Sequence, residues 1–178
     1  ILASGEKVMK DCVNLRVVGE IDELNCVLGI TISTIKEAKN LSRLLEMLVS
    51  IQRDLFLAGS EISVLQSVVS PPLRGGGRRR CSVVIENKQI EALETQIDTW
   101  TAELPELKNF ILPGGHPTSA HLHLARAICR RLERELVSLG KSKPIRPELY
   151  KYFNRLSDWL FVGARWVNCI MGEKEEII

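Results

Sequence analysis

Apolar residues recur every three or four positions through most of the chain, which is the spacing of a helix with one buried face. Five segments have this pattern: residues 16–38, 40–63, 87–103, the part of 110–139 that follows a glycine turn, and 148–171. No segment convincingly shows the alternation of apolar and polar residues that is typical of a half-buried strand. The pattern therefore predicts an all-α protein, folded as an up-and-down bundle of five helices.

The helical pattern is interrupted between the second and third segments, at residues 64–86. Pro71 and Pro72 cannot continue a helix, and three glycines stand among four arginines in the stretch 74–80. No Lys-Ser/Thr pair follows, so this stretch is not a Walker A loop. We expect a flexible basic loop here, with a phosphate-binding or RNA-binding loop as the alternative.

Composition changes this picture little. The chain has 178 residues, of which 45% are hydrophobic and 26% charged, as expected for a single globular domain over residues 1–178. A net charge of +2 is no argument for a polyanionic partner, and no apolar run approaches the ~20 residues of a membrane helix. Because the sequence begins with Ile1 rather than Met, a signal or transit peptide before it stays open.

The cysteines and histidines do not form a recognisable metal or disulfide pattern. The five cysteines are scattered without a C-x-x-C pair, which favours reduced thiols in an intracellular protein. His116, His121 and His123 lack an acidic residue at metal-helix spacing, so we expect structural or hydrogen-bonding roles for them. Ser119 and Ser157 have no credible base spaced around them, so hydrolase chemistry is not indicated.

Positive charge is concentrated on the fourth segment. Arg126, Arg130 and Arg134 follow one another at intervals of four residues, so a helix places them on one side, with Glu133 beside them. An apolar stripe is expected on another side, at Leu124, Ile128, Leu132, Leu136 and Leu139. The simplest interpretation is a solvated charged face in which Glu133 and Glu135 neutralise the arginines.

The approach to this segment favours a second interpretation. Pro113, Gly114, Gly115 and Pro117 predict a turn at the helix start, where free backbone N–H groups and the helix dipole attract an anion. Arginine side chains bind phosphate through paired N–H donors. The arginine stripe is therefore a candidate phosphate site.

Two long motifs resemble the signatures of the PduO-type ATP:cob(I)alamin adenosyltransferases. The first comprises Phe110–Gly115, Ser119-Ala120, His123, Ala125-Arg126, Arg130-Arg131 and Glu133-Arg134; the second comprises Asn154–Asp158, Leu160-Phe161 and Ala164-Arg165. Gly19–Asn25 and the residues Ser4, Gly5, Val8 and Lys10 are also similar to that family. The family's Thr/Gly/Asp nucleotide loop would stand further upstream, so residues 1–12 are interpreted as a remnant of it.

The resemblance implies a reaction and an assembly. The 5′-deoxyadenosyl group of ATP would be transferred to the cobalt of cob(I)alamin, forming adenosylcobalamin and releasing triphosphate. Cob(I)alamin is itself the nucleophile, so the protein needs none. The family implies a ferritin-like helical bundle, a homotrimer with active sites between subunits, and ATP with Mg²⁺ and cobalamin as ligands. It also implies a flavoprotein reductase and an adenosylcobalamin-dependent acceptor enzyme as partners, without nucleic acid or membrane. The location would be the cytoplasm, or the mitochondrial matrix in a eukaryote.

The resemblance also assigns roles to residues. Phe110, Arg126 and Arg130 would be catalytic, with Phe110 expelling the lower axial ligand of cobalt. The nucleotide would be bound by Lys10, Arg130, Glu133, Arg134 and Asn154. At the subunit boundary Asp22 would pair with Arg126, while Arg155 and Asp158 would brace the site. Mg²⁺ would be held through the ATP phosphates, with Glu133 as the candidate protein contact.

Two other functions remain open from the residues alone. One is a polyanion- or RNA-binding helical module that uses the arginine helix and the basic loop. The low net charge and the few aromatic residues argue against it. The other is a helical-bundle scaffold that has lost catalysis together with its nucleotide loop.

Overall fold

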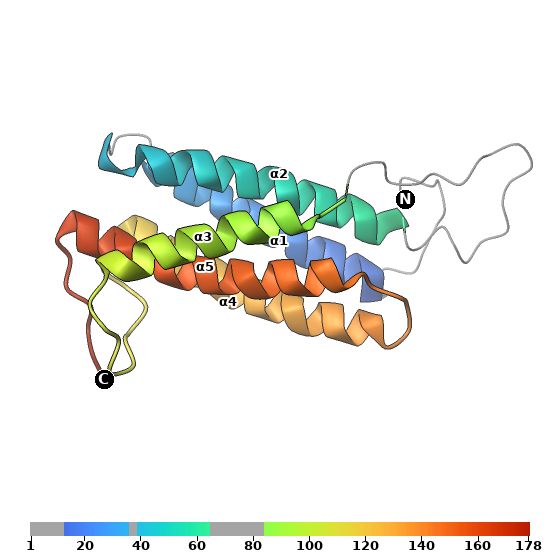
Figure 1. Cartoon of the computed structure of the whole chain (residues 1–178). Coiled ribbons are helices and arrows are strands. Elements are labelled where there is room, and N and C mark those ends of the chain that lie inside the picture. The colour runs from blue at the N-terminus through green and yellow to red at the C-terminus, as the bar shows by residue number, and fades with distance from the viewer. Residues whose placement is uncertain (1–12, 36–38, 65–83) are drawn as a thin grey trace, which may run out of the picture.

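The computed structural model describes residues 13–35, 39–64 and 84–178 of the chain. It contains α1 (Val13–Ile35), the short 3-10 helix η1 (Lys39–Leu41), α2 (Ser42–Val64), α3 (Asn87–Glu103), α4 (Pro117–Gly140) and α5 (Pro147–Met171). The five long helices lie side by side and alternate in direction, as Figure 1 shows. The predicted all-α up-and-down bundle of five helices is therefore confirmed.

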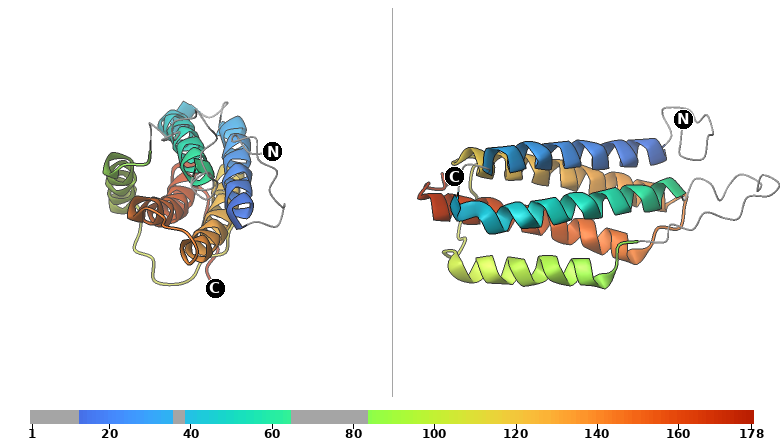
Figure 2. Two further views of the ribbon diagram at one scale, coloured as in Figure 1. Left: turned by 90° about the vertical axis from the view of Figure 1, so that its right-hand side faces the viewer. Right: turned by 90° about the horizontal axis from the view of Figure 1, so that it is seen from above.

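The helices pack around α4 and α5. α4 packs against both α1 and α5, α2 packs against α1, and α3 packs against the outer side of α5. Figure 2 shows this arrangement along the bundle axis, with α3 at the edge beside α5. Residues 163–168 of α5 are all buried, because helices or loops cover this end of α5 on every side. No helix of the described part is long and apolar enough to cross a membrane.

Tryptophan side chains attach α3 to α5. The ring of Trp100 on α3 stacks on that of Trp166, with centroids 5.1 Å apart, and lies 5.0 Å from that of Trp159. Gly163 makes room for this contact, since a Cβ there would lie 3.0 Å from the Trp100 ring. Aromatic side chains bury large apolar areas, so this cluster is a main attachment of the outer helix to the bundle.

The predicted apolar stripe of α4 is wrong at one position. Leu124 is 51% exposed, whereas Leu122 and Ala125 are fully buried in its place. Steps of four residues advance the side-chain direction by about 40° each on a helix of 3.6 residues per turn. Leu124, four residues before Ile128, is therefore turned off the buried side of α4 near the N-terminal end of the helix.

Gly140 is the last residue of α4. It is still helical, and Lys141 serves as the C-cap in the right-handed conformation. A Cβ at Gly140 would overlap the Tyr150 hydroxyl of α5. The glycine therefore leaves room for the Tyr150 side chain of α5, and its backbone is not in the left-handed conformation.

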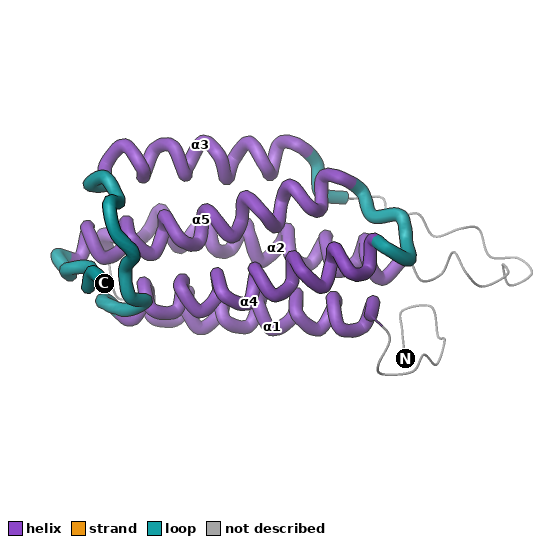
Figure 3. Tube along the Cα trace, turned by 90° about the horizontal axis from the view of Figure 1, so that it is seen from below, coloured by secondary structure: helices purple, strands orange, loops and turns teal. Residues whose placement is uncertain are grey.

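Two segments meet at one end of the bundle (Figure 3). The connection from α3 to α4, residues 104–116, is called the Phe110 loop below, and residues 172–178 are called the tail. Ile111 and Ile177 form an isolated antiparallel bridge, and the structure assigns no strand to the described residues. Residues 1–12 and most of the predicted basic loop, at 65–83, lie outside the described residues.

Candidate active site

The arginine stripe of α4 is not neutralised by the acids beside it. Glu133 accepts a hydrogen bond from Asn154, and Glu135 lies 4.0 Å from the Arg16 guanidinium. Arg130 and Arg134 are exposed, and neither has a hydrogen bond or ion pair with any residue in the described ranges. The solvated-face interpretation required Glu133 and Glu135 as partners of these arginines. The observed geometry leaves their charges available to an anion.

Arg126, the first arginine of the stripe, is less exposed to solvent than Arg130 and Arg134. Its side chain is half-buried, its Nε has no hydrogen-bond partner among the described residues, and its guanidinium lies 5.7 Å from the centre of the Phe161 ring. Burial, and then the positive charge of Arg130, lower the pKa of Arg126. A nearby anion stabilises a half-buried, unpaired guanidinium more than an exposed one, because burial weakens the screening of charge by solvent.

His123 lies one turn before Arg126 and faces Phe161. It is 4% exposed, and neither ring nitrogen has a partner in the part of the chain that the structure describes. Its ring centroid is 6.0 Å from that of Phe161. Burial, and then the charge of Arg126, lower the pKa of His123, which keeps the imidazole neutral. Within the described ranges, no cluster of three potential ligands could hold a metal ion.

His116 has the hydrogen-bonding role predicted for it. Its Nδ1 accepts a hydrogen bond from the backbone N–H of Thr118 at 3.2 Å, and the side chain thereby caps the N-terminus of α4. Pro117 follows at the first helical position, where a missing N–H has no consequence. The turn predicted from Pro113 to Pro117 thus leads directly into the arginine helix.

Arg131 points away from the stripe and joins α4 to α1. Its Nε donates to Glu20 Oε2 at 2.6 Å, and its Nη2 donates to Glu23. These hydrogen bonds, to Glu20 first and then to Glu23, raise the pKa of Arg131. Adjacent arginines on α4 therefore have different environments: Arg130 is unpaired among the described residues, and Arg131 is engaged between helices.

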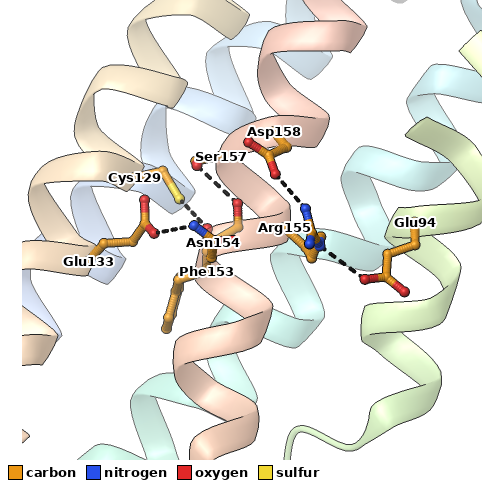
Figure 4. Close-up of polar contacts among 8 residues, drawn as sticks. All are labelled: Glu94, Cys129, Glu133, Phe153, Asn154, Arg155, Ser157 and Asp158. Atoms are coloured by element: carbon orange, nitrogen blue, oxygen red, sulfur yellow. Dashed lines mark hydrogen bonds and ion pairs between the residues drawn. The ribbon is translucent and has the colours of Figure 1, made fainter. Parts of the chain in front are cut away.

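Polar contacts on α5 connect the stripe to α3 (Figure 4). Asn154 Nδ2 donates to Glu133 Oε1 at 3.2 Å, which places Asn154 beside the stripe. Arg155 binds Asp158 at 2.8 Å and also Glu94 of α3 at 2.9 Å. Arg155 and Asp158 both lie on α5, and Glu94 extends their contact to α3. This network fixes α5 between its two neighbours.

Phe110 has an exposed ring on a backbone that is held in place. The side chain is 85% exposed, whereas the Phe110 carbonyl accepts from the Ile178 N–H at 3.0 Å. The Leu112 N–H donates to the Glu176 carbonyl at 2.8 Å. A large apolar ring in this position is available to a bound molecule.

Asn168 holds the other end of the Phe110 loop. Its Nδ2 donates to the Gly114 carbonyl at 3.1 Å, and its Oδ1 accepts from the His116 N–H at 3.0 Å. Gly115 has φ 87°, and a Cβ there would overlap the Asn168 side chain. Sequence reasoning identified this glycine turn but missed Asn168, its partner on α5.

One predicted site residue, Asp22, is not brought to the stripe within the described part of one chain. Asp22 is exposed on α1, and no ion pair joins it to Arg126 or to any other described residue. Its neighbours Glu20 and Glu23 bind Arg131 instead. Lys10 lies outside the described residues. The pairing of Asp22 with Arg126 across a subunit boundary stays a prediction.

Comparison with known proteins identifies the family. The model of the cobalamin adenosyltransferase family matches residues 1–167. The chain belongs to the cobalamin adenosyltransferases. It is 37% identical over 168 residues to the corrinoid adenosyltransferase of Bacillus subtilis (strain 168), covering 94% of this chain and 81% of the relative. The corresponding values for a corrinoid adenosyltransferase of Citrobacter freundii are 36% over 164 residues, with 92% and 86% covered.

Solved structures of this family have the same fold. A variant of the PduO-type ATP:corrinoid adenosyltransferase from Lactobacillus reuteri, complexed with cobalamin and ATP, aligns with a TM-score of 0.84 and 30% identity. That alignment covers 99% of this chain and 92% of the other. A second variant, complexed with ATP, has the same TM-score and identity. The predicted resemblance to the PduO-type adenosyltransferases is thus confirmed in sequence and in fold.

Proposed function

We propose that this protein is an ATP:corrinoid adenosyltransferase, which transfers the 5′-deoxyadenosyl group of ATP to the cobalt of cob(I)alamin. The match of the cobalamin adenosyltransferase model to residues 1–167 carries this proposal. The unneutralised arginine stripe supports it, because a triphosphate is the kind of anion that such a stripe binds. This arrangement favours adenosyl transfer over a non-catalytic bundle.

The chemistry divides between the substrate and the protein. The electron pair of Co(I) attacks C5′ of ATP, the cobalt–carbon bond forms as the C5′–oxygen bond breaks, and triphosphate leaves with that bonding pair. The protein must orient C5′ against cobalt and stabilise the negative charge on the leaving group. Arg130 and Arg134 perform the second task, because both are exposed and unpaired among the described residues.

Glu133 and Asn154 complete the nucleotide side of the site. Asn154 contacts the nucleotide and is oriented by its hydrogen bond to Glu133. Mg²⁺ would bind together with ATP and would be held mainly through the phosphates, as is usual for this ion. One carboxylate beside the arginines, Glu133, suits that mode of binding, in which a protein supplies few of the ligands. Arg155 and Asp158, which form an ion pair on the same helix, brace the site.

Phe110 acts on the corrinoid side. Its exposed ring occupies the lower face of cobalt and displaces the axial donor, which eases reduction of Co(II) to Co(I). An aromatic ring suits this task because it fills space and has no donor atom for cobalt. The held backbone and the free ring of Phe110 support this role.

The complete site lies between subunits of a homotrimer. Arg126 pairs there with Asp22 of the partner subunit, and both side chains lack an ion pair among the described residues of one chain. Lys10, in the nucleotide-loop remnant 1–12, contributes to ATP binding. The chain acts as one domain over residues 1–178. It works in the cytoplasm, or in the mitochondrial matrix of a eukaryote, between a flavoprotein reductase and an adenosylcobalamin-dependent enzyme.

A spectral assay tests the function. Purified protein is mixed with ATP, Mg²⁺ and chemically reduced cob(I)alamin, and the appearance of adenosylcobalamin and of triphosphate is measured. Stoichiometric formation of both products is expected. No product, together with RNA binding that weakens steeply with salt, would instead support the polyanion-binding module. No product and no RNA binding would indicate a scaffold.

A further inference from the structure

The end of α5 holds the Phe110 loop and the tail through one buried arginine. The Arg165 side chain is only 8% exposed, and its Nε lies 3.0 Å from Glu175 Oε1 of the tail. Its Nη2 donates to the Pro105 carbonyl of the Phe110 loop at 3.1 Å. A single guanidinium therefore connects two segments that are far apart in sequence. Because it is buried, removal of its acid would leave an uncompensated charge.

The tail in turn holds the backbone of Phe110 itself. Ile178 donates its N–H to the Phe110 carbonyl, and Glu176 accepts from the Leu112 N–H. These two hydrogen bonds flank the residue whose ring is exposed. The position of Phe110 thus depends on the tail, and the tail is attached to the bundle by Glu175.

We propose that Arg165 and Glu175 are positioning residues for Phe110, which set the place of its ring during the reduction and alkylation of cobalt without touching either substrate. The proposal rests on the function proposed above for Phe110. The acidic half of this clamp, Glu175, lies in the tail, beyond residues 1–167 that match the family model. A rigid loop presents a side chain more accurately than a loose one.

Glu175→Ala tests the clamp, and Glu173→Ala is its matched control. Both variants remove one carboxylate from the tail, but among the described residues only Glu175 binds Arg165. Hydrogen exchange at the Leu112 and Ile178 amides is measured first. We expect faster exchange at both amides in Glu175→Ala and the wild-type rate in Glu173→Ala. Glu175→Gln keeps an acceptor oxygen and should restore part of the protection. Unchanged exchange in Glu175→Ala would overturn the proposal.

Kinetics separate positioning from a general loss of stability. In an assay that starts from cob(II)alamin with a mild reductant, Glu175→Ala should lower kcat by about tenfold, because small misplacements of a catalytic group have effects of this order or larger. The KM for ATP should not change, and the loss should be smaller with cob(I)alamin prepared beforehand. A rise in the KM for ATP, or equal losses in the two assays, would overturn the positioning role.

A double-mutant cycle with Phe110→Ala completes the test. If Glu175 acts through Phe110, the double variant should be no slower than Phe110→Ala alone. Additive losses would overturn the proposal while leaving the role of Phe110 intact. If Phe110→Ala is as active as the wild type in both assays, the proposed role of Phe110 fails, and the positioning role fails with it.

Discussion

Replacing Arg130 by alanine tests the claim that the arginine stripe binds triphosphate. Arg130 is exposed and has no partner among the described residues, so its removal breaks no contact within that part of the chain. It also relieves repulsion, because its charge is one cause of the lowered pKa of Arg126. We therefore expect the free energy of unfolding to change little or to rise slightly.

The expected kinetic effect is much larger. A hydrogen bond to a charged group contributes about 1.5–3 kcal/mol, which corresponds to roughly one to two decades in kcat/KM. Charge develops on the departing triphosphate, so part of the loss should appear in kcat and not only in the KM for ATP. Initial rates with prepared cob(I)alamin, measured over a range of ATP concentrations, separate the two parameters.

Arg131→Ala is the matched control, because it removes the next arginine on the same helix. This side chain binds Glu20 and Glu23 on α1. Its loss should lower the melting temperature by an amount equivalent to about 1 kcal/mol in total, since exposed ion pairs are weak, and should leave the KM for ATP unchanged. If both variants had equal, small kinetic effects, the stripe would be a solvated surface and the reasoning would be refuted.

Three further predictions concern the subunit boundary, the corrinoid side and the buried histidine. Asp22→Asn should weaken the trimer or ATP binding by ~3–5 kcal/mol if it leaves Arg126 unpaired and partly buried; unchanged sedimentation and ATP titration would remove Asp22 from the site. Phe110→Ala should abolish activity from cob(II)alamin and spare most of it from prepared cob(I)alamin, and equal losses would reduce Phe110 to a packing role. The folded-state pKa of His123 is lowered, so the unfolded chain binds the extra proton, and stability should fall as pH drops below about 6.5. His123→Leu should flatten this part of the pH–stability curve, as measured by chemical denaturation, and an unaltered slope would contradict the assignment.

The helices could be predicted because their signal is local. Each one buries a face at regular spacing, and the same regularity placed Arg126, Arg130 and Arg134 on one side of α4. Leu124 was assigned wrongly because apolar spacing gives the direction of a helix face. It does not show how wide a face the neighbouring helices bury, or how that face turns along the helix. Arg131 follows Arg130 directly and so lies off the stripe, and its partners Glu20 and Glu23 depend on how α1 lies against α4.

The support of the Phe110 loop could not be predicted in the same way. Arg165 binds a carbonyl sixty residues earlier in the chain and a carboxylate ten residues later. Asn168 reaches the glycine turn at Gly114 and His116. Such contacts depend on the packed end of the bundle, and the side chains involved show no spacing pattern. Arg165 is part of the second family motif, but only the fold shows what it touches.

The arrangement of the tryptophans gives the protein a local optical reporter. The sequence contains three tryptophans, and all of them lie in the cluster between α3 and α5. Intrinsic fluorescence therefore reports on one interface and not on the whole chain, whereas far-ultraviolet circular dichroism averages over all the helices. Because Arg155 joins the same two helices through Glu94, we expect the emission to respond to the loss of this contact beside Asn154. A single signal, present without any label, thus follows the attachment of the outer helix next to the proposed nucleotide site.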